Sequence, residues 1–412
     1  MKQDDVLIIY GSLNSVPSPE GAAPAKVIYE TVETLNNKHF KVLSNYNPNL
    51  KSVSYNKDVF KHVKPNIFDR CALIVLKAIY PFKKRKKKFV TGSDPALLYF
   101  LSVCRFLFFN RYKNIIVHVS VGLVSVIKLV FPKRNVVFYH HGTSLHTKYS
   151  EEQWLQLITH STAVFAVNQI ALKKANSTFK NQLDSSRYFA IPNAIIPKVN
   201  IEEAKAYYKN RTYDSNTFVF AFTGRICIEK GVLHLLEAFK KVYEVNKNVS
   251  LVVFGAAGTR GKHDIKTEYL KQCYDFAELN NIPIKFAGFL ENNKLLKAIA
   301  EVDAIISPTD IKYYEEGMPL SLVEALSLGK PIIATNSGGN YEVVKEHVNG
   351  FLITSHPYVD ELSEAMLKIS LDKELYSLLA KGAYTSYIEN HSHESYNATF
   401  LNALMEINFW NE

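Results

Sequence analysis

The sequence predicts an α/β protein with two doubly wound, Rossmann-like domains that face a cleft. The chain has 412 residues, a length that suits two domains of about 200 residues each. In its second half, nearly continuous apolar strands alternate with amphipathic helices, which is typical of a parallel sheet covered on both faces. The first half repeats this alternation less regularly. Such sheets bind ligands beyond the carboxyl ends of their strands, so two facing domains predict a site in the cleft between them.

Strands and helices of the second half are separated clearly by turn residues. β-Branched and aromatic runs predict strands, whereas apolar residues recurring at helical spacing predict helices. The predicted strands are 217–225, 249–258, 283–290, 304–310 and 331–339. The predicted helices are 231–245, 266–280, 292–302 and 319–328.

The first half contains apolar runs that predict further strands, with room for helices between them. These runs are 6–12, 41–46, 89–93, 114–120, 135–141 and 162–168. Pro192 and Pro197 punctuate a polar transition, which places the first domain at 1–197 and the second at 198–385. The last segment, 386–412, has a helical pattern, and we expect it to return to the first domain.

Positive charge is concentrated in the first half of the chain. The formal net charge is +10, and residues 1–200 hold 28 Lys and Arg against 11 Asp and Glu, so this part carries +17 and the remainder −7. The densest run, KKRKKK at Lys83–Lys88, directly follows an apolar stretch at 71–82. An apolar segment followed by cations suits docking on an anionic membrane surface, although a solvated loop has the same pattern. No recognised nucleic-acid-binding module accompanies the charge, so nucleic acid is not a predicted partner.

Cysteine usage and the N-terminal residues indicate a cytoplasmic protein. Cys71, Cys104, Cys227 and Cys273 are far apart and form no C-x-x-C pair, so we expect buried free thiols in a reducing compartment. The chain begins MKQDDVLIIYGS, which predicts a first strand; a signal peptide would need a basic start and a longer apolar run. No run approaches the roughly 18 apolar residues of a membrane-spanning helix.

The stretch YYEEGMPLSLVEALSLGKP (313–331) combines two carboxylates with a short apolar helix. Pro319 suits the first turn of this helix, where its missing N–H costs nothing. The free amides of 318–321 and the helix dipole form an anion site, which Glu316 and Glu324 flank. A phosphate site with carboxylates that grip hydroxyl groups is what a nucleotide sugar requires. Spacing alone is equally compatible with a solvated Glu324 and an ordinary loop charge at Glu316.

A second motif, TGRICIEKG at 223–231, follows the first strand of the second domain. Arg225 and Lys230 bracket the loop between this strand and the next helix. Two cations at the carboxyl end of a strand suit a diphosphate and the charge that develops on it. Taken alone, the motif is equally compatible with an ordinary surface pair.

Two loops of the first domain carry candidate residues beyond predicted strand ends. Gly11 and Gly21 allow close approach of the backbone to a ligand. YHHGTS (139–144) ends an apolar strand with His140 and His141, and strand alternation turns one of them towards the cleft. An ordinary hydrogen-bonded loop histidine gives the same pattern.

Several chemistries lack their signature in this chain. There is no G-x-G-x-x-G for a nicotinamide, no D-x-D or H-x-x-x-H for a metal ion, and no G-x-S-x-G or Cys/His arrangement for a covalent nucleophile. The run GTRGKH (258–263) departs from a P-loop in its glycine spacing. We therefore expect neither a metal ion nor an organic cofactor.

Together these motifs resemble the retaining glycosyltransferases of family 4, which have the GT-B fold. T-G-R-x-x-x-x-K-G at 223–231 is similar to the family's phosphate-binding motif, and E-G-M-P-L-S-L-V-E-A-L at 316–326 to its two-glutamate motif. GKPIIATNSGGNYEVV (329–344) and NGFLI (349–353) follow in the family's order. The resemblance is strong over 217–355 and weak in the first domain.

The resemblance implies a role for each matching residue of the second domain. Arg225 and Lys230 would bind the donor diphosphate. Glu316 would contact the hydroxyls of the donor sugar, and Glu324 those of the ribose. Contacts to the phosphate or the sugar are also implied for the backbone amides near Met318 and Leu320.

In the first domain the resemblance implies fewer contacts. His141 would lie next to the reacting centre, with His140 as the alternative. Gly21 matches a loop where the family often has a glycine pair, but the sequence here reads Gly-Ala-Ala. The implied catalytic set is His141, Glu316, Arg225 and Lys230.

The activity that the resemblance implies is metal-independent transfer of a hexosyl unit, with retention, from a UDP-linked sugar to a glycan or lipid-linked acceptor in cell-surface polysaccharide synthesis. The first domain would hold the acceptor, and Lys83–Lys88 would place the enzyme at the inner face of the cell membrane. A nucleotide-sugar epimerase of the same architecture and a non-catalytic glycan-assembly protein remain alternatives. An epimerase would convert the donor without any acceptor, whereas an assembly protein would not need its intact site residues.

Overall fold

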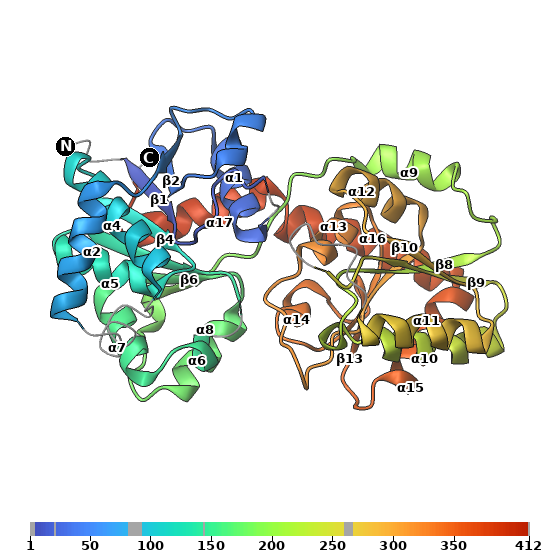
Figure 1. Ribbon diagram of the computed structural model, residues 1–412. Coiled ribbons are helices and arrows are strands. Elements are labelled where there is room, and N and C mark those ends of the chain that lie inside the picture. Colours follow the sequence, from blue (N-terminus) through green and yellow to red (C-terminus); the bar gives the residue numbers. More distant parts are fainter. Residues whose placement is uncertain (1–4, 20–21, 81–92, 143–144, 259–266, 411–412) are drawn as a thin grey trace. The chain divides into compact units, whose positions relative to one another are not determined.

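The computed structural model describes residues 5–19, 22–80, 93–142, 145–258 and 267–410. The chain forms two compact units: unit 1 comprises Met1–Pro192 and Tyr396–Glu412, and unit 2 comprises Asn193–Ser395. Each unit is built on one parallel β-sheet with helices on both of its faces (Figure 1). The predicted fold class of two doubly wound α/β sheets is thereby confirmed.

Unit 1 holds a seven-stranded sheet in the order β3-β2-β1-β4-β5-β6-β7. Its strands are β1 (Val6–Tyr10), β2 (Phe40–Asn45), β3 (Phe60–Val63), β4 (Asn114–His118), β5 (Asn135–His140), β6 (Ala163–Ala166) and β7 (Tyr188–Ala190). Its helices are α1 (Ala23–Leu35), α2 (Ile67–Ile79), α4 (Asp94–Phe109), α5 (Val121–Val130), α6 (Leu145–Lys148), α7 (Glu151–His160), α8 (Gln169–Thr178) and α17 (His393–Glu406). The strand order reverses between β1 and β4, which makes their carboxyl ends the switch point of this sheet.

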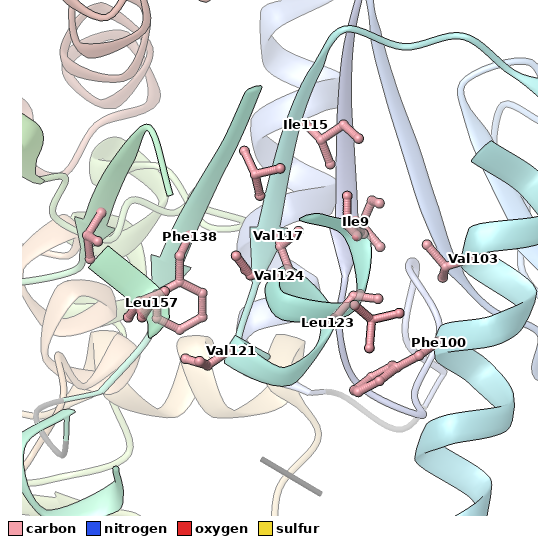
Figure 2. Close-up of a cluster of buried hydrophobic side chains, with 14 of the residues drawn as sticks. Ile9, Phe100, Val103, Ile115, Val117, Val121, Leu123, Val124, Phe138 and Leu157 are labelled. Carbon is pink, nitrogen blue, oxygen red and sulfur yellow. The ribbon is translucent and has the colours of Figure 1, made fainter. Parts of the chain in front are cut away.

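The main core of unit 1 lies between its sheet and helices α4, α5 and α7. Alternate residues of the central strands face these helices, including Ile9, Val117 and Phe138. Figure 2 shows them together with Phe100 of α4 and Leu123 of α5. Burial of the strands on both faces is what their Val- and Ile-rich sequences predict.

The opposite face of this sheet receives α17, which comes from the far end of the sequence. The buried ring of Phe400 lies beside those of Phe40 on β2 and Phe165 on β6, with ring centroids 6.1 and 6.4 Å apart. At the start of β4, the side-chain amide of Asn114 donates to the backbone carbonyl of Phe409 at 2.9 Å. The C-terminal segment is therefore part of the core of unit 1.

Unit 2 holds a six-stranded sheet in the order β10-β9-β8-β11-β12-β13. Its strands are β8 (Phe218–Thr223), β9 (Val249–Phe254), β10 (Ile284–Gly288), β11 (Ala304–Ser307), β12 (Ile332–Thr335) and β13 (Gly350–Ile353). Its helices are α9 (Ile201–Lys209), α10 (Val232–Val245), α11 (Glu268–Asn280), α12 (Asn292–Glu301), α13 (Leu320–Ser327), α14 (Asn340–Val343), α15 (Val359–Leu371) and α16 (Lys373–Asn390). Helix α10 packs against α11 and α15, whereas α13 packs against α16 (Figure 1).

The boundaries between the units differ from those predicted from the proline positions. The units divide after residues 192 and 395, whereas the predicted limits are 197 and 385. The Tyr387 hydroxyl donates to the Ile195 carbonyl at 3.2 Å, and the His391 ring lies 2.9 Å from the Asn193 carbonyl. These bonds attach the first crossing segment and the end of α16 to each other within unit 2.

Three features of unit 1 differ from the predicted elements or fall outside the described residues. β3 and β7 are absent from the predicted set, because FKHV and YFA are short edge strands without a clear alternation. The strand predicted at 89–93 falls mainly on residues outside the described ranges, and Ser93 directly precedes α4.

All four cysteines are free thiols, as predicted, but only Cys104 and Cys273 are buried, whereas Cys71 is exposed and Cys227 is partly exposed. It lies on the outward side of α2, whereas Cys104 and Cys273 lie in the cores of their units. Among helices of the described residues, none is both long and apolar enough to cross a membrane.

Replacing Phe400 by Ala should destabilise unit 1 by about 3–5 kcal/mol, because the change leaves a cavity among buried rings. Both tryptophans of the chain, Trp154 and Trp410, lie in unit 1, so their fluorescence during urea unfolding reports this unit. Leu378→Ala, at an exposed position of α16, should leave the midpoint unchanged. An unchanged midpoint in the Phe400 variant would contradict the packing of α17 against this sheet.

Candidate active site

The candidate site of unit 2 lies at the point where its strand order reverses. β8 and β11 are neighbours in the sheet, although β9 and β10 separate them in the sequence. Loops that leave neighbouring strands in opposite directions open a crevice at their carboxyl ends. The segments after these two strands, 224–231 and 308–319, contain the two motifs singled out from the sequence.

Lys230 and Glu316 form an ion pair that joins the two motifs. The Thr309 hydroxyl donates to the same carboxylate oxygen, Oε1, at 2.6 Å. Glu316 is only 5% exposed, so its charge needs these partners. Within the described residues its other oxygen, Oε2, takes part in no hydrogen bond, which leaves it available to a hydroxyl group of a ligand.

The backbone of the Glu316 turn is fixed by the loop that follows β12. The amide of Glu316 donates to the Ser337 hydroxyl at 3.3 Å, and the amide of Gly339 donates to the Glu316 carbonyl at 2.7 Å. A Cβ atom at Gly339 would lie 1.6 Å from the Gly317 carbonyl oxygen, so only glycine allows this approach. Main-chain packing therefore determines where the carboxylate lies.

The turn leads directly into the free N-terminus of α13. Pro319 is the N-cap residue, and within the described residues no hydrogen bond uses the amides of Met318, Leu320 or Ser321 as donors. These amides and the helix dipole favour an anion. Met318 is buried, and its carbonyl accepts from the Asn193 side chain at 3.2 Å. The amides that the predicted anion site would use therefore have no other acceptor among the described residues.

Arg225 lies on the exposed loop after β8. Among the described residues its guanidinium has no ion-pair partner. The preceding Gly224 has φ of 154°, and a Cβ at Gly255, after β9, would lie 1.8 Å from the Gly224 carbonyl oxygen. A close backbone contact thus fixes the base of the loop, while the cation extends into solvent, where it can meet an anionic ligand.

Glu324 lies in α13, eight residues after Glu316, and is only 6% exposed. Its burial excludes the solvated position that spacing alone had left open. The Ser327 hydroxyl donates to its backbone carbonyl at 2.8 Å, as a local bond within the last turn. Glu324 is therefore a buried carboxylate of the helix that carries the anion site.

A group of aromatic and imidazole rings occupies the switch point of unit 1. His141 follows β5, and its Nε2 lies 2.7 Å from Nδ1 of His118 at the end of β4, so one of the two nitrogens donates to the other. The Tyr139 ring packs beside both imidazoles, with centroids 4.7 Å from each. His140 points into the buried interior, and no partner for its Nε2 lies among the described residues. The structure thus favours His141 over His140 as the histidine that a ligand can reach.

Burial keeps these histidines neutral near physiological pH. It lowers the pKa of His141 to about 3, and the pKa of His118 well below its usual value. The pKa of His140 is lowered to about 3, first by burial and then by the nearby Lys148 and His141. A neutral His118–His141 pair holds a single shared hydrogen bond, which fixes the orientation of the His141 ring.

The turn after His118 uses an unusual backbone conformation. Val119 has φ of 63°, a region that β-branched residues rarely adopt. The amides of Ser120 and Gly11 both donate to the His118 carbonyl, at 2.9 and 3.0 Å. A Cβ at Gly11 would lie 2.5 Å from the Ser120 Cβ, so Gly11 serves this packing. Strained backbone of this kind concentrates at functional sites.

The predicted site residues fall into three groups. Lys230 and Glu316 are in contact, and Arg225 lies on the same loop as Lys230. Met318, Leu320 and Glu324 follow on the turn and helix that begin at Glu316. His141 lies in unit 1, and Gly21 and Lys83–Lys88 lie outside the described residues.

Three partners of the site were not among the predicted residues. Thr309 and Ser337 hold the Glu316 turn, and His118 holds His141. His118 could have been selected from the sequence by the same criterion as His141, because it also lies at the end of an apolar strand. Within the described ranges, no group of three His, Cys, Asp or Glu side chains is placed to hold a metal ion.

Two doubly wound parallel sheets, with cations and a buried carboxylate at the switch point of the second, define this protein as a two-domain α/β protein. Comparison with known families makes the assignment specific. Residues 205–386 match the family model of the group 1 glycosyl transferases. This region, slightly less than half of the chain, belongs to the retaining, family 4 glycosyltransferases that its motifs predict, and related solved structures have the GT-B fold.

Curated relatives match about half of the chain. The lipopolysaccharide 1,2-N-acetylglucosaminetransferase of Salmonella typhimurium is 26% identical over 206 residues, which cover 49% of this chain and 52% of the relative. The UDP-Gal:alpha-D-GlcNAc-diphosphoundecaprenol alpha-1,3-galactosyltransferase of Escherichia coli is 27% identical over 198 residues, which cover 47% of this chain and 48% of the relative. The matched regions thus span about half the length of these relatives.

Solved structures share the fold over nearly the whole chain. Anabaena HepE, crystallised with UDP, superposes with a TM-score of 0.71 at 17% sequence identity. The match covers 97% of this chain and 99% of HepE. The likeness therefore establishes the GT-B fold for both units.

The free energy of unfolding of unit 1 should decrease less on acidification in the His140→Leu variant than in the wild type. An unfolded histidine takes up a proton below about pH 6.5, whereas folded His140 stays neutral down to about pH 3, so its contribution is complete above pH 6.5 and declines below it. At about pH 5 the loss should be about 2 kcal/mol.

Urea unfolding followed by tryptophan fluorescence at about pH 7 and about pH 5 measures this difference. His347→Leu, at an exposed histidine of unit 2, should leave the difference as in the wild type. An equal difference in the His140 variant and the wild type would contradict a neutral, buried His140.

Proposed function

We propose that this chain is a retaining glycosyltransferase that moves a hexosyl unit from a UDP-linked sugar to a glycan or lipid-linked acceptor in cell-surface polysaccharide synthesis. The observation that carries the proposal is the contact of Lys230 with Glu316, which joins two distant motifs at the switch point of a sheet. The UDP complex of HepE supports UDP as the carrier. The names of the Salmonella and Escherichia relatives support a glycan or lipid-linked acceptor.

The diphosphate of the donor would be bound by fixed positive charge. Arg225 and Lys230 supply two cations, and the free amides at the start of α13 supply oriented dipoles. Such preorganised groups stabilise the charge that develops on a leaving diphosphate. Because these groups come from the chain itself, we propose that the reaction needs no metal ion.

The sugar and the ribose would be held by the two glutamates. Glu316 keeps one carboxylate oxygen bonded to Lys230 and Thr309, which leaves the other for a sugar hydroxyl. Glu324 is proposed to accept from the ribose hydroxyls. His141, oriented by His118, is proposed to lie next to the reacting centre as a neutral hydrogen-bonding group.

Retention is proposed to follow from attack on the face that the diphosphate leaves. The charge of Glu316 is shared with a lysine ammonium and a threonine hydroxyl, which suits gripping a hydroxyl better than attack on carbon. Departure of UDP would then run ahead of bond formation to the acceptor. Isolation of a covalent glycosyl-enzyme would contradict this order of events.

Glu316→Gln should lower UDP release from the donor by about a hundredfold or more, because it removes the charge that pairs with Lys230 and grips the sugar. The measurement is UDP release by the purified chain over a panel of UDP-sugars, with and without EDTA. Glu315→Gln changes the neighbouring carboxylate and should retain wild-type rates.

Two results would contradict the proposal in different ways. Equal loss in both variants would show that charge in the loop, and not Glu316 in particular, matters. Conversion of the donor to another UDP-sugar without release of UDP would identify an epimerase. Urea unfolding of each variant separates loss of activity from loss of folding.

Arg225→Ala should weaken UDP binding by about tenfold to a hundredfold, because a charged hydrogen bond contributes about 1.5–3 kcal/mol. The exposed position of Arg225 predicts unchanged stability. Isothermal titration with UDP measures the change, and Lys294→Ala, an exposed cation on α12, is the control. Equal affinity in the two variants would remove Arg225 from the donor site.

The location proposed for the enzyme is cytoplasmic, peripheral at the inner face of the cell membrane. A lipid-linked acceptor lies in that plane, and the Lys83–Lys88 run favours it by charge. That run lies outside the described residues.

A further inference from the structure

Helix α2 carries apolar residues on two opposite sides. Its inward side packs into the core of unit 1 or against it. The inward residues are Asp69, Leu73, Leu76 and Tyr80. The outward residues are Ile67, Cys71, Ile74 and Ala78. Within each row the residues recur at the spacing of a helical stripe. The two rows are displaced from each other by two residues, which corresponds to about 200° around the helix axis. The second stripe therefore faces away from the core.

The outward stripe is wide and strongly exposed. Phe68 is 73% exposed and Ile74 is 68% exposed. Val75 and Ile79, on one flank, are also more than half exposed. A soluble amphipathic helix has one apolar stripe and a polar opposite face, so this pattern needs a partner. We call these residues, Ile67, Phe68, Cys71, Ile74, Val75, Ala78 and Ile79, the outer face of α2.

Helix α4 extends the apolar surface at the N-terminal end of α2. The two helices pack side by side (Figure 1), and Arg105 of α4 lies 3.1 Å from Asp69 of α2. Lys77 pairs with Asp94 at the other end, so the helices run antiparallel. Phe108 and Phe109, at the end of α4, are 71% and 77% exposed. They are thereby placed near the same end of α2 as Phe68.

Helix α5 ends beside the same edge. The Arg134 guanidinium, just after α5, donates to the Leu107 carbonyl of α4 at 2.7 Å. Leu129 and Val130, in the last turn of α5, are at least half exposed. Ends of three helices thus bring exposed apolar side chains to one edge of unit 1.

Apart from Asp94, which pairs with Lys77, the exposed charges around this surface are basic. Between residues 95 and 150 the sequence holds seven Lys and Arg but no Asp or Glu. On the exposed sides of α2 the charged residues are Arg70 and Lys77, both basic. Exposed Arg111, Lys113 and Lys133 lie in the loops after α4 and α5. Apolar side chains bordered by cations match the interface of a bilayer that contains anionic lipids.

We propose that the outer face of α2, with the ends of α4 and α5, seats unit 1 on the surface of an anionic membrane, an inference that rests on the lipid-linked acceptor of the proposed function. The apolar side chains enter the boundary between headgroups and acyl chains, and the cations meet the headgroups. A second copy of the chain is a poorer occupant, because pairing this face with itself brings like charges together. The helix lies in the interface and does not cross it.

The test compares one triple variant with a matched control on the full chain. Phe68→Ser, Ile74→Ser and Ile79→Ser together remove the centre of the face. Val245→Ser, Leu279→Ser and Leu378→Ser remove three exposed apolar residues of unit 2. Co-sedimentation with phosphatidylcholine vesicles, with and without phosphatidylglycerol, measures binding. We expect tight binding to the anionic vesicles, weakened about tenfold or more by the first variant and unchanged by the second.

A probe on Cys71 distinguishes insertion from adhesion by charge. Cys71 is exposed on the outer face of α2, whereas Cys104 and Cys273 are buried. The chain is labelled in the Cys227→Ser background with an environment-sensitive fluorophore. Its emission should shift to the blue when anionic vesicles are added, and the shift should persist at about 0.15 M salt. Binding without any shift, lost in salt and equal in both triple variants, would overturn the proposal.

Two further measurements keep this proposal separate from the proposed activity. UDP release from a soluble donor should be equal in both triple variants, since none of the substituted residues belongs to the site of unit 2. Intact release with no vesicle binding would overturn the membrane seat alone, whereas vesicle binding without release by any donor would overturn the activity alone. Sedimentation velocity without lipid should show a monomer; a dimer abolished by the first variant would identify a second copy as the occupant.

Discussion

The ion pair between Lys230 and Glu316 is the contact on which the site of unit 2 depends. A buried carboxylate is costly unless it is paired, and this one meets a cation from a loop 86 residues away in the sequence. The pair can form only where β8 and β11 lie side by side, although two other strands separate them along the chain. The order of the strands, the position of the two loops and the charges on them therefore depend on one another. A change in any of them would leave the buried Glu316 carboxylate without the Lys230 ammonium.

The two units use the same switch point for different chemistry. In unit 2 the reversal of strand order brings together a cation, a carboxylate and free helix amides, which are charged or strongly polar groups. In unit 1 the equivalent position holds neutral rings, with His118 and His141 joined by one hydrogen bond beside Tyr139. The switch point of unit 2 thus holds charged groups, whereas the switch point of unit 1 holds neutral rings. A donor side in unit 2 and an acceptor side in unit 1, as proposed, would use this difference.

Sequence patterns predicted strands β8 to β12 of unit 2, because each is a nearly continuous apolar run and turn residues or helical periods follow it. They also selected Lys230 and Glu316, which the structure brings into contact, whereas the roles of these residues stay predictions. The short edge strands β3 and β7 escaped prediction, because pairing with a neighbour stabilises them and their own sequences are too short to show a period. Thr309, Ser337 and His118 escaped because they act through contacts distant in sequence. The outer face of α2 could not be distinguished from a core stripe, since only the fold decides which side of a helix is covered.

Glycines give the site loops of unit 2 a further property. Backbone meets backbone at Gly231 and Pro308, at Gly255 and Gly224, and at Gly339 and Gly317, where any Cβ would collide with a carbonyl oxygen. The loops around the site are thus held together by contacts of the main chain at these three positions. For the proposed donor site, such a scaffold would allow side chains to set the sugar preference while the backbone of the loops keeps its place.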